Sequence, residues 1–223
     1  MRVSFKGAHV EKDIILTCVR WYVVYPLSYR QLEEMMQERG VAVDHSTSHR
    51  SVLTYAPQLE HRFRRQKRPV GMSWRMDETS LKVEGQWYYL YRAVDQEGQT
   101  IDFPLTTHRD ELAATRFLTK AIERPAKITI DGSEANAAAT RRYNQEHGTA
   151  IMIRQVKYLN HLVEQDHRGV KRLTRPMLGF KSFDTALYTL TGIELMHMLR
   201  KAQIEEGVEP GLTPAQRFCA LAA

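Results

Sequence analysis

Apolar residues recur at helical spacing through the first 56 residues and indicate three short helices. The stripe from Glu11 to Tyr25 predicts the first helix, which Pro26 ends. Ser28 begins the second helix, because Gln31 three residues later completes a Ser-x-x-Gln capping box, and Gly40 supplies the stop. The sequence therefore predicts a helical N-terminal region.

A third helix is predicted from a cap at Asp44 or Ser46 to about Tyr55, with a small and polar first half. Two helices joined by a short turn that contains glycine, the second with a polar N-terminal half, are typical of a DNA-reading helix-turn-helix. Its candidate base-reading residues are Ser46, Thr47 and Arg50. The alternative is an unrelated three-helix bundle, in which these polar residues are only surface.

A basic linker is expected over residues 58–71, between Pro57 and a Pro-Val-Gly sequence. The chain has a net charge of +6, and residues 1–70 carry 12 Lys and Arg against 7 Asp and Glu. Such an asymmetric basic end favours a polyanion, with nucleic acid as the first candidate. A solvated linker without a ligand is the alternative. The candidate DNA contacts here are Arg62, Arg64, Arg65, Lys67 and Arg68.

After the linker, aromatic and β-branched runs replace the helical pattern. We predict an antiparallel meander of three strands (74–83, 86–95, 100–106), then a helix (109–123), a strand (127–131), a helix (135–147), a strand (150–154) and two helices (159–173, 182–203). This order describes an α/β, ribonuclease-H-like sheet. The expected domains are a helix-turn-helix (1–57), the linker (58–71), a catalytic domain (72–203) and a C-terminal tail (204–223).

Two acids interrupt or end predicted strands that we expect to be neighbours at the centre of the sheet, namely Asp77 and Asp131. Carboxylates that meet there need a compensating cation, and a pair of divalent metals is the usual remedy in phosphoryl-transfer sites. Glu164, on a later helix, is the candidate third ligand. One face of that helix also offers Arg168 and Lys171 to phosphate, and Arg172 is a further candidate DNA contact.

Each of these acids also has a structural interpretation, as an edge-strand, turn or solvent-facing residue. Three other acids compete for the same roles: Asp95 begins a turn, Asp102 lies on an outer strand, and Asp166 points to another face of the helix that carries Glu164. His45 and His49 have zinc-ligand spacing without an obvious third ligand. We expect them to face a groove or the core.

Several function classes are excluded by composition. Apolar content of 43% can bury a core, no apolar run is long enough for a membrane span, and the N-terminus has no secretory pattern. No glycine-rich phosphate loop is present, so neither an ATPase nor a nucleotide cofactor is expected. The two cysteines, Cys18 and Cys219, are too few for a disulfide framework. We expect a cytoplasmic protein without membrane contact.

Three long stretches resemble the DDE transposases of bacterial insertion sequences, family six, and the resemblance covers essentially the whole chain. The stretches are VRWYVVYPLSYRQLEEMMQERGVAVDHST, WRMDETSLKVEGQWYYLYRAVDQEGQTIDFPLT and IRQVKYLNHLVEQDHRGVKRLTRPMLGFKSF. The resemblance implies a helix-turn-helix that binds the terminal inverted repeats, followed by a ribonuclease-H-like catalytic domain. It also implies location on the DNA of a bacterial cell.

The resemblance implies that Asp77, Asp131 and Glu164 form a metal-binding triad. It also implies that Lys171 lies on a basic helix that assists catalysis. It implies Mg²⁺, with Mn²⁺ tolerated, and the joining of element ends to target DNA, typically as cointegrates. Because two active sites must act on two ends, a homodimer or a larger homo-oligomer acting on double-stranded DNA is expected.

This sequence departs from the family pattern near the second acid, where Gly132 and Glu134 replace the usual Lys and Gly, and at Ser80, where Tyr is common. The gap between Asp131 and Glu164 is also slightly short. These changes keep a second hypothesis in view, a catalytically impaired copy that binds the inverted repeats as a repressor. A non-specific ribonuclease-H-type nuclease would explain the triad but not the N-terminal helices.

Overall fold

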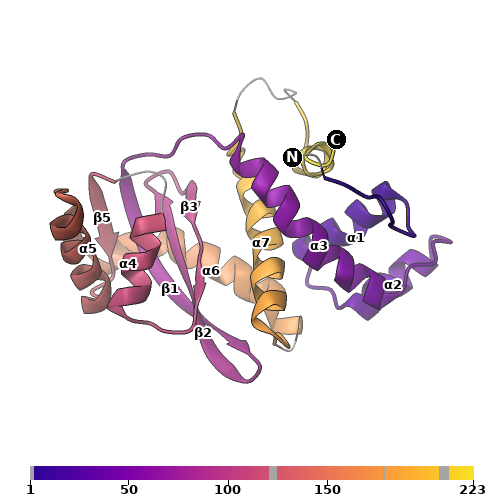
Figure 1. The fold of residues 1–223 in the computed structure, drawn as a ribbon, viewed down its shortest axis with the longest axis horizontal. Coiled ribbons are helices and arrows are strands. Elements are labelled where there is room, and N and C mark those ends of the chain that lie inside the picture. Colours follow the sequence, from indigo (N-terminus) through magenta and orange to yellow (C-terminus); the bar gives the residue numbers. More distant parts are fainter. Residues whose placement is uncertain (1–2, 121–124, 178, 206–210) are drawn as a thin grey trace. The chain divides into compact units, whose positions relative to one another are not determined.

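The computed structural model describes residues 3–120, 125–177, 179–205 and 211–223, and it divides into two compact units (Figure 1). A helical unit comprises residues 1–68 and 170–223, and an α/β unit comprises residues 69–169. Helix α6 (His161–Thr174) belongs to both, because the division falls after Gly169. Within the described ranges, no helix has the length and apolar character needed to cross a bilayer.

The first two helices of the helical unit confirm the prediction from periodicity and capping. Helix α1 runs Lys12–Val24, and α2 runs Tyr29–Gln37. At the start of α2 both bonds of the capping box are present: the Gln31 amide donates to the Ser28 hydroxyl, and the Ser28 amide donates to the Gln31 side chain. These two bonds satisfy backbone donors that the first helical turn otherwise leaves unpaired.

Helix α3 (His45–Arg64) is longer than predicted, and the expectation that it ends near Tyr55 is wrong. Pro57 lies inside the helix rather than at the start of a linker. An internal proline costs roughly 3 kcal/mol. The apolar period nevertheless continues past it, because Leu59 and Phe63 are fully buried. Arg62 and Arg64 therefore lie in the last turn of a helix, whereas Arg65, Lys67 and Arg68 follow it.

Helix α7 (Phe183–Arg200) packs against α1 and α3 and is grouped with them in the helical unit. Gly192 permits the approach: a Cβ there would lie 2.7 Å from Cγ1 of Val23 and 3.2 Å from Cβ of Ala56. After the short 3-10 helix η2 (Arg175–Met177) and α7, the described part of the tail forms α8 (Pro214–Ala220), while residues 206–210 of the predicted tail lie outside the described residues.

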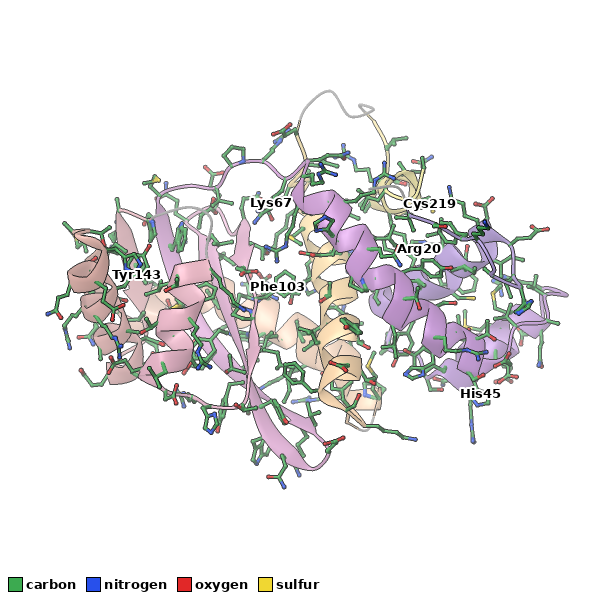
Figure 2. The ribbon with its side chains drawn as sticks, viewed as in Figure 1. Arg20, His45, Lys67, Phe103, Tyr143 and Cys219 are labelled. Carbon is green, nitrogen blue, oxygen red and sulfur yellow. The ribbon has the colours of Figure 1, made fainter. Side chains whose placement is uncertain are left out.

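Helix α8 packs against α1 and α7. Thr213 and Gln216 form a second capping box at its start, with Pro214 at the first helical position. Arg20 of α1 and Cys219 of α8 are labelled in Figure 2, which shows the side chains of this region. The end of the chain is therefore part of the helical unit.

The α/β unit is built on one sheet with the strand order β3-β2-β1-β5-β6, and β4 also pairs with β2. The predicted meander is present, with its third strand divided in two by Pro104, which cannot donate to a ladder. Antiparallel β1–β2–β3 and parallel β1–β5–β6 give the ribonuclease-H-like order that the sequence predicts. The strands are β1 (Ser73–Val83), β2 (Gln86–Asp95), β3 (Thr100–Asp102), β4 (Leu105–Thr106), β5 (Lys127–Ile130) and β6 (Met152–Gln155).

Helices α4 (Glu111–Lys120) and α5 (Glu134–His147) pack against each other and contribute to the core of this unit. Trp74 and Met76 of β1, Phe117 of α4 and Ala137 of α5 are buried together there. The last residues of the predicted helix, 121–123, lie outside the described residues. The short 3-10 helix η1 (Lys157–Asn160) leads from β6 into α6. A packed sheet of this kind holds the residues at its strand ends in fixed positions.

Candidate active site

Asp77 lies on β1, and Asp131 directly follows β5, the parallel neighbour of β1 at the centre of the sheet. Ser73, Trp74 and Arg75 of β1 are paired with Lys127, Ile128 and Thr129 of β5. Continuing this register by two residues places Asp77 level with Asp131, the first residue after β5. Level residues of parallel strands project to the same face. The structure thus brings the first two predicted acids together.

The charge around Asp77 is unfavourable for its ionised form. Burial, followed by the negative charges of Glu78, Asp131 and Glu164, raises the pKa of Asp77 to about 7. The side chain of Asp77 is only 17% exposed. Its neighbour across the strand pair is Arg92, which forms an ion pair with a different carboxylate. A cation beside Asp77 would relieve this repulsion.

Glu164 lies in the first turn of α6, close enough for its charge to act on Asp77. Its carboxylate is 3.7 Å from Nη2 of Arg168 and 3.5 Å from Nδ1 of His161, and its side chain is 36% exposed. Just before α6, buried Asn160 donates to the carbonyl oxygen of Met76 on β1, at 3.3 Å. This bond ties the start of the helix to the strand that carries Asp77.

The three acids fit a divalent metal by their chemistry. Carboxylate oxygens are the ligands that Mg²⁺ and Mn²⁺ prefer, and the mutual repulsion at Asp77 is the penalty that a bound cation removes. Within the described ranges, no three His, Cys, Asp or Glu side chains are gathered closely enough to form a metal cluster as they stand. The assignment of Asp77, Asp131 and Glu164 as metal ligands stays a prediction.

Two buried residues beside the site, one on β2 and one on α6, were missed by the sequence analysis. Arg92 is fully buried on β2 and forms an ion pair with Asp166, with 2.9 Å between Nη1 and Oδ2. His167 is also buried, and its Nε2 lies 3.6 Å from Oδ2 of Asp77. A cation in the middle of the apolar run QWYYLYRAVD is a signal that could have revealed Arg92, because a buried guanidinium requires a partner. Asp166 is that partner, so its carboxylate is held by Arg92 of β2.

A second buried network occupies the other face of the sheet. The Glu78 side chain is 1% exposed, forms an ion pair with Arg109 and accepts a hydrogen bond from Asn136 of α5 at 3.0 Å. The negative charge of Glu78, and to a lesser extent that of Asp131, raises the pKa of Arg109. Asp77 and Glu78 are consecutive on β1, so their side chains must point to opposite faces of the sheet. The sequence therefore already indicated that Glu78 lies on the face away from Asp77. The network anchors α5 and the loop before α4 to β1.

The competing residues have structural roles. The Asp95 carboxylate accepts hydrogen bonds from the amides of Glu97 and Gln99, as expected of a residue that begins a turn. Asp102 ends β3 at the edge of the sheet. His45 lies 3.0 Å from the carboxylate of Glu33, and His49 packs edge-on against Tyr29. The two histidines therefore have protein partners other than a shared metal.

The predicted DNA-reading residues lie at the start of α3. The Asp44 carboxylate caps this helix by accepting from the amides of Ser46 and Thr47, both at 2.9 Å. The hydroxyls of Ser46 and Thr47 also donate to Asp44. Nη2 of Arg50, an exposed residue, donates to Oγ1 of Thr47 at 3.1 Å. The hydroxyls of Ser46 and Thr47 are thus engaged in capping the helix, whereas Arg50 is a long cationic side chain exposed to solvent at the same end of α3.

The predicted basic linker is largely bound within the helical unit. Arg64 pairs with Glu60 one turn earlier, and Arg62 donates to the carbonyl oxygen of Ala223 at 2.5 Å. The backbone of Lys67 pairs with that of Ile204 in an isolated antiparallel β-bridge, and Arg68 also interacts with another residue of the protein. Arg65, the residue that follows α3, is exposed. On α6, Arg168 is exposed near Glu164, while Lys171 and Arg172 follow in its last turns.

Comparison with known proteins gives a consistent family assignment. A family described as a DDE domain matches residues 71–203. The transposase for the insertion sequence-like element IS431mec of Staphylococcus aureus is 38% identical over 208 residues, which cover 88% of this chain and 88% of that protein. The transposase for the insertion sequence element IS257 in transposon Tn4003, also from Staphylococcus aureus, has the same identity and coverage.

Among solved structures, the magnesium-bound HTLV-2 integrase catalytic core in its dimeric form aligns with a TM-score of 0.44 and 17% identity, over 67% of this chain and 97% of that one. The catalytic core of BIV integrase aligns with the same TM-score and identity, over 67% and 95%.

Proposed function

The chain belongs to the DDE transposases of bacterial insertion sequences, family six, and we propose that it binds the terminal inverted repeats of its element and catalyses Mg²⁺-dependent nicking and strand transfer. The reaction produces cointegrates, and it needs neither a covalent protein–DNA intermediate nor a nucleotide cofactor. The observation that carries the proposal is the register of β1 and β5, which sets Asp77 level with Asp131. Glu164 approaches the same carboxylate from α6.

We assign Asp77, Asp131 and Glu164 as the residues that hold Mg²⁺, with Mn²⁺ as a substitute. When bound, the metal supplies activation of the attacking hydroxyl and stabilisation of the leaving oxygen in an in-line displacement at phosphorus. The protein holds these three acids in place: Asn160 ties the start of α6 to β1, and Asp166 pairs α6 with Arg92 of β2. Lys171, two turns after Glu164 on the same helix, orients a DNA phosphate.

Sequence recognition falls to the helical unit. Helices α2 and α3 form the helix-turn-helix, and the N-terminal half of α3 enters the major groove of the terminal repeat. Arg50 is the leading base-reading candidate, because the capping bonds already occupy the hydroxyls of Ser46 and Thr47. Arg65 contacts the backbone of element or target DNA. Two ends must be processed together, so the active form is a homodimer or a larger homo-oligomer.

A metal-dependence experiment tests this proposal. Purified protein is incubated with end-labelled duplexes that carry the terminal repeat flanking its gene, with Mg²⁺, Mn²⁺, Ca²⁺ or EDTA. We expect a nick at the repeat boundary with Mg²⁺ and Mn²⁺ and none with EDTA. Tight repeat binding without nicking in either metal would instead identify an impaired copy that acts as a repressor. Cleavage of any duplex regardless of sequence would identify a non-specific nuclease.

A further inference from the structure

Arg109, in the loop before α4, has an exposed guanidinium although its counter-ion is buried. The side chain of Glu78 is 1% exposed, whereas that of Arg109 is 52% exposed. The pair of Arg92 and Asp166 is arranged in the opposite way, with the arginine fully buried. The Arg109 pair therefore presents a cation to solvent as well as anchoring a loop.

Glu78 fixes the orientation of this guanidinium. Nε of Arg109 donates to Oε1 of Glu78, and the other carboxylate oxygen of Glu78 accepts from Nδ2 of Asn136 at 3.0 Å. Among the residues that the structure describes, none is hydrogen-bonded to the two terminal nitrogens of Arg109. These nitrogens carry four N–H groups, and the planar fork of a guanidinium matches the oxygens of a phosphate. The anchored side chain is thus ready to bind an oxyanion.

The loop that carries Arg109 is braced on both sides of this residue. The Thr106 hydroxyl donates to the carbonyl oxygen of His108 at 2.8 Å. The Asp110 carboxylate accepts from the amide of Ala113 at 2.8 Å, at the start of α4. Both bonds form within the protein and need no ligand. A side chain that is held in place before DNA arrives loses less conformational freedom on binding.

A chain of hydrogen bonds connects Arg109 to the predicted metal ligand Asp131. The Ser133 amide donates to Oδ1 of Asp131 at 3.0 Å, and the Asn136 amide donates to the Ser133 hydroxyl at 3.4 Å. The Asn136 side chain then bonds to Glu78, the partner of Arg109. The negative charge of Asp131 also acts on Arg109 and helps to raise the pKa of the arginine. Arg109 therefore borders the candidate active site where β5 ends and α5 begins.

We propose that Arg109, oriented by buried Glu78, binds a phosphate of the DNA strand that enters the active site beside Asp131. The proposal rests on the proposed function, because it takes Asp131 as part of the site that nicks and joins DNA. The phosphate belongs to the element end or to the target DNA, since both reach the site during strand transfer. A contact of this kind fixes the position of a strand without reading its sequence.

The first test compares two full-length variants that differ only at Arg109. Arg109→Gln alone would leave the buried Glu78 carboxylate without its counter-ion, so the double variant Glu78→Gln/Arg109→Gln is compared with Glu78→Gln. The amide introduced by Glu78→Gln can still accept the hydrogen bond from Asn136, and circular dichroism checks that both variants fold.

With Mg²⁺ and a repeat duplex, strand transfer by the double variant should be roughly 10- to 100-fold slower than by Glu78→Gln, as expected for the loss of hydrogen bonds between charged groups. Lys120→Gln removes an exposed charge at the other end of α4 and should leave the wild-type rate unchanged. Equal rates for the double variant and Glu78→Gln would overturn the proposal.

The second test locates the phosphate and identifies its source. A neutral methylphosphonate linkage is moved one position at a time along the element end. In a separate set it is fixed in a target duplex, and the joining positions are mapped by sequencing. One position in the element end, or one offset from the linkage in the target, should disfavour joining by Glu78→Gln but have no further effect on the double variant. Identical effects on the two variants at every position would overturn the proposal.

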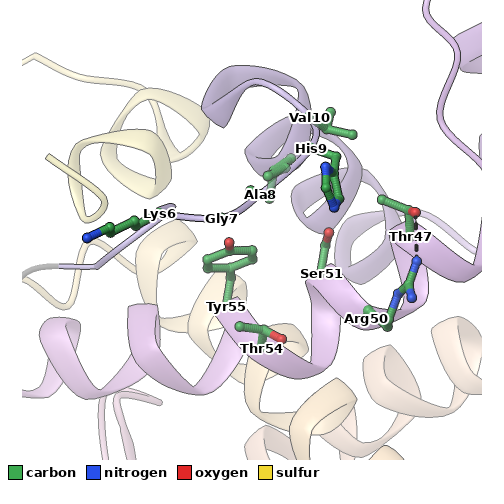
Figure 3. A pocket seen from close by; sticks show the side chains of 11 residues that line it. Lys6, Gly7, Ala8, His9, Val10, Thr47, Arg50, Ser51, Thr54 and Tyr55 are labelled. Carbon is green, nitrogen blue, oxygen red and sulfur yellow. Dashed lines mark hydrogen bonds between the residues drawn. The ribbon is translucent and has the colours of Figure 1, made fainter.

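Sequence preference separates this contact from base reading. Arg50 of α3, the leading base-reading candidate, donates to Thr47 at one end of a hollow in the helical unit (Figure 3). Arg50→Gln should lower the preference for the repeat over a scrambled duplex, whereas the double variant should retain the preference of Glu78→Gln. A lower preference in the double variant would contradict a phosphate contact. The proposed function fails separately, if the wild-type protein neither binds the repeat nor nicks it.

Discussion

Asp166 of α6 and Arg92 of β2 form an ion pair in which Oδ2 lies 2.9 Å from Nη1 and the arginine side chain has no exposed surface. Burial lowers the pKa of Arg92, and the charge of Asp166 opposes that shift. A guanidinium taken fully out of water is stable only beside its counter-ion. The pair therefore fastens the helix that carries Glu164 to the strand next to the one that carries Asp77.

Asp166→Asn should consequently destabilise the protein by about 3–5 kcal/mol, because it leaves a buried charge uncompensated. Urea unfolding followed by circular dichroism measures this. Glu146→Gln is the matched control, since it removes the same charge from an exposed pair with Arg142 on α5 and should leave the free energy of unfolding nearly unchanged. If the two variants unfolded at the same urea concentration, the Arg92–Asp166 pair would have no part in holding α6.

Helix α7 provides a test of packing in the helical unit. Gly192→Ala places a methyl group 2.7 Å from Cγ1 of Val23, closer than carbon atoms approach, so we expect a loss of about 1–3 kcal/mol in the free energy of unfolding. Val23→Ala opens space at that contact. In its background the Gly192→Ala penalty should shrink by about 0.5 kcal/mol or more, as residues in contact couple. An unchanged penalty would place the strain elsewhere.

DNA recognition separates into two measurable effects. Arg50→Gln should reduce the preference for the terminal repeat over a scrambled duplex by roughly 5- to 150-fold, equivalent to about 1–3 kcal/mol for a bidentate base contact. Arg65→Gln should weaken both duplexes alike and lower the salt slope by about one. Binding isotherms at several salt concentrations distinguish the two. A uniform loss in Arg50→Gln would move base reading to another part of α3.

The N-cap of α3 gives a pH-dependent effect. Hydrogen bonds from Ser46 and Thr47 hold the pKa of Asp44 well below its ordinary value of 3.8. A carboxyl whose pKa is lowered on folding stabilises the folded state above its unfolded pKa, and that contribution is lost as the pH falls. Asp44→Asn retains a cap but does not titrate. The stability advantage of the wild-type protein over this variant should therefore shrink between about pH 5 and pH 2; an advantage independent of pH would contradict the role of the charge.

Much of this fold could be predicted from local patterns. Periodicity and a Ser-x-x-Gln box were sufficient for α1 and α2, and alternation with turn residues was sufficient for the meander. The end of α3 was missed because Pro57 is a strong local stop signal that the burial of Leu59 and Phe63 overrides. The position of α7 could not be predicted, since a helix buried on nearly all sides has no single face that indicates its neighbour.

The candidate site was less accessible to sequence reasoning than the fold. The pairing of Asp77 with Asp131 followed from strand order, but the hydroxyls of Ser46 and Thr47 could equally have faced DNA or the cap. Only the three-dimensional structure distinguishes a hydroxyl that faces DNA from one that caps the helix, because both arrangements use the same residues at the same spacing. Arg92 required knowledge of which strand α6 covers. Ion pairs between residues far apart in the sequence, such as Arg92 and Asp166, are thus the features that were hardest to predict.

The most direct measurement is strand transfer by Glu164→Gln. The substitution keeps the size of a partly exposed side chain but removes one of three negative charges around the proposed metal, so the variant should fold and bind the repeat like the wild-type protein. Nicking and strand transfer with Mg²⁺ should both fall by about 100-fold or more, which corresponds to roughly 2.7 kcal/mol of transition-state stabilisation. Glu146→Gln should retain both activities. Undiminished strand transfer by Glu164→Gln would contradict the assignment of Asp77, Asp131 and Glu164 as the catalytic triad.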